Sequence, residues 1–97
     1  MNGAQFWITD TIGNARTISV KGREEWALRC LIAAGQKGCT PLDTPGPRWS
    51  AYIHDLRAMG VEIETINEKH GGPFRGTHAR YVLRSHVTPL NHAGRAA

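Results

Sequence analysis

The chain has 97 residues, a formal net charge of +4, and apolar and charged fractions of 40% and 21%. These values predict one soluble domain with a modest core. No apolar run approaches the roughly 20 residues of a membrane span. The start, MNGAQFWITD, lacks the basic residues and the long apolar segment of a secretory signal. We therefore expect a cytoplasmic protein.

Residues 1–20 are predicted to form a β-hairpin. Gln5 to Thr11 and Arg16 to Val20 are rich in aromatic and β-branched residues. Gly13-Asn14 between them is a two-residue turn of the kind that accepts positive φ. We expect this hairpin to pack on or beside the core, where it covers one side of the core or offers a surface to a second copy in a homodimer.

The first long helix is predicted at 22–34. Two acids, Glu24 and Glu25, lie in its first turn, where carboxylates suit the positive end of the helix dipole. One side of this helix is apolar at helical spacing, and it carries Trp26, Ala27, Cys30, Leu31 and Ala34. Residues 37–40 are then extended at best. Pro45 and Pro47 limit any helix that begins at 41–43 to about one turn.

A second long helix is predicted at 47–59. Trp49, Ile53, Leu56 and Met59 recur at spacings of four, three and three, which places them on one apolar stripe. Gly60 then stops the helix at a position that favours positive φ. This helix and the strand that follows it form the centre of a small α+β domain.

A long hairpin is predicted after this helix. Its strands are 61–67 and 78–85, and a glycine-rich, basic loop joins them. In the second strand Tyr81 and Leu83 face the core, and Val82 alternates to the other side. We expect residues 21–86 to form the main domain and residues 87–97 a disordered tail. The predicted core is Trp26, Leu31, Trp49, Ile53, Leu56, Val61, Ile63, Tyr81 and Leu83.

The positive charge is concentrated in the last third of the chain. Residues 68–97 carry five lysines and arginines against the single acid Glu68, and they also carry four of the five histidines. This asymmetry favours a polyanionic partner, most simply nucleic acid. A solvated basic face without a partner is the alternative.

The order of these elements resembles a winged helix-turn-helix. RWSAYIHDLRAMGVEIET followed by THARYVLRS is similar to small bacterial and phage-associated winged-helix domains, over roughly residues 22–85. In that family the last helix carries a pattern like IHDLR, runs through a glycine into IET and is followed by an ARYxL strand. The resemblance implies an α+β winged helix with a two-stranded wing. This chain departs from the family pattern at residues 41–47, where a turn with prolines abbreviates the second helix, and it adds an N-terminal β-hairpin.

The resemblance implies that the helix from Arg48 enters the major groove of double-stranded DNA, while the wing follows the backbone. On the helix the implied DNA-binding residues are Arg48, Ser50, Ala51, Tyr52 and His54. For Tyr52, half-burial is the alternative to a phosphate contact. On the wing they are Lys69, His70, Arg75, His78 and Arg80. The implied function is that of a small transcriptional regulator of phage or mobile-element type. The alternative is a winged-helix module that binds protein and not DNA.

Neither an enzyme nor a metal protein is indicated. The sequence has no P-loop, no nucleophile elbow and no His-Glu-x-x-His motif. Its five histidines share no tight ligand spacing, and its two cysteines have no metal or redox spacing. We therefore expect no catalytic residue, no metal and no cofactor.

Overall fold

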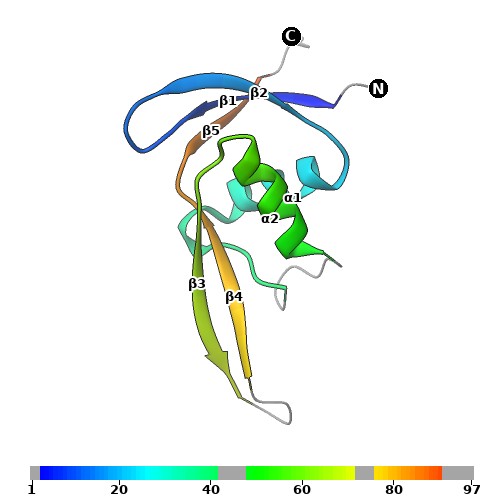
Figure 1. The fold of residues 1–97 in the computed structure, drawn as a ribbon, viewed down its shortest axis with the longest axis vertical. Helices are drawn as coiled ribbons and strands as arrows, with labels where there is room; N and C mark the ends of the chain where they lie inside the picture. The colour runs from blue at the N-terminus through cyan, green and yellow to red at the C-terminus, as the bar shows by residue number, and fades with distance from the viewer. Residues whose placement is uncertain (1–2, 42–47, 72–75, 91–97) are drawn as a thin grey trace.

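Two helices and two antiparallel sheets form the described part of the chain, which covers residues 3–41, 48–71 and 76–90 of this computed structural model. In chain order the elements are β1 (Ala4–Thr9), β2 (Ala15–Val20), α1 (Gly22–Ala34), a 3₁₀ turn η1 (Gly35–Lys37), α2 (Trp49–Ala58), β3 (Ile63–His70), β4 (Gly76–Leu83) and β5 (His86–Leu90). Figure 1 shows the three-stranded sheet of β1, β2 and β5 at one end and the β3–β4 hairpin at the other.

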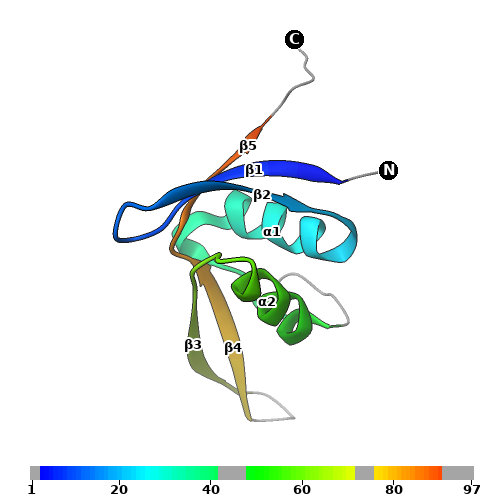
Figure 2. The ribbon, with the colours of Figure 1, turned by 45° about the horizontal axis from the view of Figure 1, so that its top comes forward.

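The three-stranded sheet has the order β2-β1-β5, with both outer strands antiparallel to β1. Because alternate residues of a strand face opposite sides, Phe6, Ile8, Ile18 and Val20 all point to one face, where they are buried. Figure 2 shows α1 lying beneath this sheet. These four residues belong to the same apolar cluster as the helices. The hairpin therefore helps to build the core, although none of its residues is in the core predicted from the sequence.

The turn of the N-terminal hairpin differs from the prediction, because its loop runs from Asp10 to Asn14. The carboxylate of Asp10 accepts hydrogen bonds from the backbone N–H groups of Ile12, at 3.0 Å, and Asn14, at 2.9 Å. The backbone N–H of Asp10 donates to the carbonyl oxygen of Asn14 at 2.9 Å. An aspartate that bonds its own backbone in this way stabilises a wider loop than a two-residue turn.

The predicted core is largely confirmed. Leu31, Trp49, Ile53, Leu56, Val61, Ile63 and Tyr81 are buried, and Trp26 and Leu83 are partly buried against them. Helix α1 has the predicted bounds, and α2 begins at Trp49, with Arg48 as its N-cap. Both helices bury the apolar stripes that their sequences indicate.

The end of α2 is a Schellman motif built on Gly60. This glycine has a φ of +98°, as its position predicts. Its N–H donates to the carbonyl oxygen of Arg57 at 2.9 Å, and the N–H of Val61 donates to that of Leu56 at 3.1 Å. Val61 and Leu56 are both buried, which supplies the apolar contact that accompanies this motif. The chain is thereby turned from α2 directly into β3.

The hairpin of β3 and β4, here called the wing, runs from Ile63 opposite Leu83 to His70 opposite Gly76. Compared with the predicted ranges 61–67 and 78–85, both strands lie further toward the tip, so part of the expected loop is strand, whereas residues 61–62 and 84–85 lie outside the strands. At its base Cys39 forms an antiparallel bridge to Tyr81, with backbone hydrogen bonds of 2.9 and 2.8 Å. The extended piece predicted at 37–40 thus pairs, through Cys39, with the edge of β4 that does not pair with β3.

Two sequence predictions are corrected by the fold. Val82 is only 1% exposed, although its alternation predicts the solvent side. A Cβ built on Gly38 would come within 2.8 Å of Val82 Cγ2, so the segment after α1 covers this face of β4. The expected tail is also wrong at its start, because residues 87–90 lie in β5 and pair with β1. Residues 91–97 and all but the first residue of the turn predicted at 41–43 lie outside the described ranges.

Candidate nucleic-acid interface

Helix α2 presents a stripe of exposed residues to solvent, and the half-exposed acid Asp55 lies at its border. Ser50, His54 and Ala58 follow one another at four-residue spacing, and all three are exposed. Ala51 lies beside them and is half-buried. Short side chains of this kind let a helix backbone approach the base edges of a major groove. The stripe thus contains Ser50, Ala51 and His54 from the predicted helical set.

Arg48 is exposed at the N-terminus of α2. Its carbonyl oxygen accepts hydrogen bonds from the N–H groups of Ala51, at 3.0 Å, and Tyr52, at 3.1 Å. No described side chain caps this helix, and its first turn contains no acid. A guanidinium at the positive end of a helix dipole is electrostatically unfavourable until an anion arrives.

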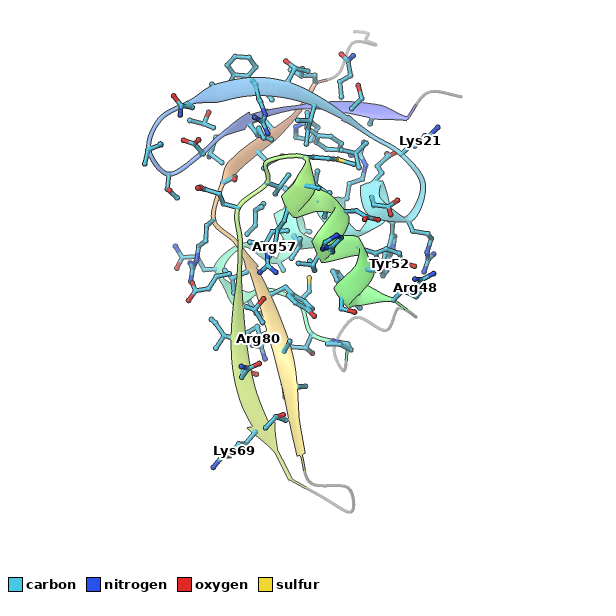
Figure 3. The ribbon with its side chains drawn as sticks, viewed as in Figure 1. Lys21, Arg48, Tyr52, Arg57, Lys69 and Arg80 are labelled. Carbon is cyan, nitrogen blue, oxygen red and sulfur yellow. The ribbon has the colours of Figure 1, made fainter. Side chains whose placement is uncertain are left out.

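Tyr52 is buried rather than open to solvent, with 6% of its surface exposed. Its hydroxyl accepts a hydrogen bond of 3.2 Å from Nε of Arg23 in α1. Beneath this pair Trp26 packs on Trp49, with ring centres 5.4 Å apart. The N-terminal halves of the two helices therefore lie against each other. Arg48 and Tyr52, four residues apart, lie on the same side of α2 (Figure 3).

The two faces of the wing differ in charge. Strand alternation and register place Thr65, Asn67, Lys69, Thr77 and Ala79 on the face that carries Ile63 and Tyr81 toward the core. This face, the α2 side of the wing, has no acidic residue among those described. Glu64 and Glu68 lie on the reverse face, where Arg84 pairs with Glu64. A phosphate backbone would therefore meet no carboxylate on the α2 side.

His78 and Arg80, both predicted to bind DNA, lie on the reverse face with Glu68. His78 Nε2 is 3.0 Å from one carboxylate oxygen of Glu68, and Arg80 Nε donates to the other at 2.6 Å. Arg80 also donates to the carbonyl oxygen of Lys37 at 2.9 Å. The hydrogen bond from Arg80, with a smaller contribution from His78, holds the pKa of Glu68 below its ordinary value. Both side chains thus join the strands of the wing to each other.

Arg57 ties the wing to α2. Its Nη2 donates to the carbonyl oxygen of Ile63 at 2.6 Å and to the Thr65 hydroxyl at 2.8 Å. Figure 3 shows this side chain between the helix and β3. An arginine in the last turn of a helix ordinarily balances the helix dipole or pairs with an acid. Instead, Arg57 fixes the angle between α2 and the wing by satisfying a carbonyl at the start of β3.

The remaining wing residues are incompletely described. Lys69 is exposed toward the free end of β3, far from α2 (Figure 3). His70 ends the strand, and its side chain lies outside the description, as does the whole of Arg75. Within the described ranges no group of three or more His, Cys, Asp and Glu side chains could hold a metal ion. None of the described helices is long and apolar enough to cross a membrane.

Helix α1, the bridge at Cys39, helix α2 and the two-stranded wing follow one another in the arrangement of a winged helix-turn-helix. The chain belongs to the winged helix domain family, whose model matches residues 17–93. No curated protein and no solved structure matches the chain. The sequence resemblance is therefore supported at the level of the fold.

Arg23, which the structure places beside the N-terminal half of α2, is not among the residues predicted from the sequence. The only local signal is its spacing of three from Trp26, which sets a guanidinium over a ring on a helix. Its second partner, Tyr52, comes from another helix, so this part of the arrangement could not be read from the sequence.

Proposed function

We propose that this protein binds double-stranded DNA, with α2 in the major groove and the α2 side of the wing along the neighbouring backbone. The observation that carries the proposal is the segregation of charge. Among the described residues the α2 side of the wing contains no acid, and on α2 the single acid Asp55 lies at the border of the exposed stripe, while Glu64 and Glu68 lie on the reverse face in ion pairs. Carboxylates at a phosphate-facing surface would oppose binding.

The geometry of the cations supports the same reading. Arg48 lies at the exposed N-terminus of α2, the part of a recognition helix that approaches base edges. Lys69 extends from the wing, where a phosphate contact requires no fixed base geometry. Arg57 holds helix and wing together, so that the two contact regions keep one relative orientation. Together these residues suit a small transcriptional regulator, of phage or mobile-element type by the resemblance of its IHDLR and ARYxL segments.

A charge-insertion experiment tests the proposal. Ser50→Glu adds a carboxylate to the N-terminal end of the exposed stripe, whereas Gln36→Glu adds one on the exposed η1 turn, which packs on α1 and β4. Binding of wild-type protein to random duplex DNA should be measurable at low salt and should fall steeply with rising salt. Ser50→Glu should abolish this binding. At about 0.1 M salt, where the Debye length is about 10 Å, Gln36→Glu should leave the affinity within about twofold.

The proposal fails if wild-type protein shows no duplex binding at low salt, or if the two variants lose affinity equally. Equal loss would mean that only net charge matters. Thermal melts of both variants should match wild type, because both positions are exposed. This control separates lost binding from lost folding.

One observation favours a second function, interaction through the three-stranded sheet. On its outer face Trp7 is 43% exposed and Leu90 37% exposed. Their neighbours by register, such as Thr17 and Thr88 opposite Trp7, are uncharged. Two copies could pair by this face without opposing like charges, at the end of the molecule away from the wing (Figure 1). We propose it as the surface of a homodimer.

The dimer can be tested by light scattering on concentrated protein. Trp7→Ser should convert dimer to monomer, whereas Ile12→Ser should not, although Ile12 is 81% exposed on the hairpin loop. A wild-type protein that is monomeric at high concentration would contradict this proposal and leave the DNA reading untouched. Failure of DNA binding with an intact dimer would favour the interaction module instead.

A further inference from the structure

Arg23, in the first turn of α1, is held in place by aromatic residues from both helices. Its guanidinium carbon lies 4.8 Å from the ring centre of Trp26 and 5.8 Å from that of Tyr52. Its Nε donates to the Tyr52 hydroxyl at 3.2 Å. A stacked guanidinium with one hydrogen bond has little rotational freedom left, although the residue remains exposed.

The charge of Arg23 is not neutralised within the described ranges. Its hydrogen bond uses Nε, and no described carboxylate lies within ion-pair distance of its terminal nitrogens. Arg29 on the same helix provides the contrast. It also lies over a ring, 5.1 Å from the centre of Phe6, but its Nε bonds to Glu25 at 2.9 Å. The two arginines have similar packing, and of the two only Arg29 is paired with a described carboxylate.

The position of Arg23 places this charge at one border of α2. Tyr52 lies one helical turn after Arg48 and on the same side, so Arg23 and Arg48 flank the N-terminal half of α2 together. The wing joins α2 through Arg57 on the other side. A helix that occupies a major groove has a row of phosphates at each border. The arrangement therefore offers a cation at the border that the wing does not reach.

We propose that Arg23 binds a backbone phosphate of DNA beside the groove that α2 occupies, and that Tyr52 is the positioning residue that holds Arg23 for this contact. The inference rests on the proposed function, and it adds α1 to the interface. A guanidinium presents paired N–H donors that match two phosphate oxygens. Because stacking and the bond to Tyr52 already restrict the side chain, less conformational entropy is lost when the phosphate binds.

Four variants test the assignment by fluorescence anisotropy on one preferred and one random duplex, over a range of salt. Arg23→Ala should weaken binding to both duplexes by about tenfold at low salt, the size of one charged hydrogen bond. It should also lower the salt slope by about one unit, because one phosphate contact is lost. Arg29→Ala removes the same charge from the same helix and should change neither quantity.

Two conservative variants isolate the positioning. Tyr52→Phe keeps the ring and removes the hydroxyl, so it should weaken binding by about two- to threefold with an unchanged salt slope, as expected for loss of orientation at a retained charge. Arg23→Lys should also keep the slope while losing part of the affinity. Thermal melts accompany each variant, and a purely structural tie between the helices would lower the melting temperature of Arg23→Ala without changing its salt slope.

The outcomes separate this inference from the proposed function. If wild-type protein binds duplex DNA and Arg23→Ala behaves like Arg29→Ala, then α1 lies outside the interface and the inference is overturned alone. If wild-type protein does not bind duplex DNA at low salt, both are overturned. If the salt slope of DNA binding falls in Arg23→Ala and does not change in Arg29→Ala, the assignment of Arg23 to a phosphate contact is supported.

Discussion

The guanidinium of Arg16 in β2 donates a hydrogen bond to the carbonyl oxygen of Met59, the residue that closes α2. Its Nη2 occupies the space where a side chain of the next residue, Gly60, would begin, since a Cβ there would lie 1.4 Å from it. The N-terminal hairpin is thereby fastened to the end of the proposed recognition helix. The hairpin loop makes a second link to the segment after α2, because the N–H of Thr11 donates to the Glu62 carboxylate at 2.8 Å.

The first prediction uses two glycines with the same backbone conformation. Gly60 and Gly13 both have a φ of +98°, but a Cβ on Gly13 would meet nothing within 4 Å. Gly13→Ala should cost about 1–2 kcal/mol of unfolding free energy from the left-handed conformation alone. Gly60→Ala should cost more, because it also displaces Arg16. Urea unfolding of both variants measures the difference.

A double-mutant cycle checks the cause. In an Arg16→Ala background the cost of Gly60→Ala should fall to that of Gly13→Ala, because the displaced guanidinium is already absent. Equal costs of the two glycine variants in wild-type background would contradict the close packing of Arg16 on the end of α2.

The second prediction concerns the core of α2. Leu56 is fully buried, and its carbonyl accepts the closing hydrogen bond of the Schellman motif. Leu56→Ala should lower the free energy of unfolding by about 2–5 kcal/mol, from lost transfer energy and the cavity left behind. Ser50→Ala on the exposed side should change it by less than about 0.5 kcal/mol. An unchanged melting temperature for Leu56→Ala would mean that the helix packs by a different face.

Local periodicity was enough to predict both helices and most of the helix-facing core. The bounds of α1, the stop at Gly60 and the burial of Leu56 follow from spacing and capping chemistry alone. Local periodicity could not predict which distant segments of the chain pack on each other. Val82 has the alternation of a solvent-facing residue, and only the return of the chain at Gly38 buries it.

The sequence indicated which types of residue make up the candidate site, but it did not indicate which face of the fold each of them occupies. Ser50 and His54 are exposed on α2, as a helical wheel predicts. His78 and Arg80 were selected because they are basic, yet the register of β3 and β4 turns them to the reverse face with Glu68. The small, polar composition after residue 86 suggested disorder, but β1 has a free edge that β5 fills. A single strand cannot reveal its partner.

The third prediction follows from the lowered pKa of Glu68. A carboxyl whose pKa is lower in the folded state contributes stability that is complete above its unfolded pKa, about 4.3 for glutamate, and is lost as pH falls through the folded value. Glu68→Gln should therefore lower the melting temperature at neutral pH. The difference from wild type should shrink below about pH 4 and vanish in stronger acid.

The hydrogen bond from Arg80 contributes most to the lowered pKa of Glu68, so Arg80→Ala supplies the control. In that background Glu68→Gln should have a smaller effect at neutral pH and a weaker pH dependence. A difference between wild type and Glu68→Gln that stayed constant down to pH 2 would show that the carboxylate charge does not act through these bonds.

The last prediction separates base contacts from phosphate contacts. Arg48 begins α2, where a guanidinium can pair with guanine O6 and N7 together, so Arg48→Ala should cost about 1–3 kcal/mol at a preferred site and much less on random DNA. Arg75, for which the sequence predicts a phosphate contact, lies outside the described residues, and Lys69 is the exposed wing cation within them. Lys69→Ala should weaken all duplexes alike and reduce the salt slope by about 0.9, because every phosphate is the same.

Lys37→Ala is the matched control for Lys69. It removes one exposed lysine side chain from the η1 turn. The backbone carbonyl of Lys37 accepts a hydrogen bond from Arg80 on the reverse face of the wing, and the substitution retains it. Competition binding against specific and random duplexes should leave Lys37→Ala at wild-type affinity and slope. If Lys37→Ala and Lys69→Ala reduced the slope equally, the wing would contribute only to the overall field of the protein. If Arg48→Ala weakened all sequences alike, its guanidinium would contact a phosphate and not a base.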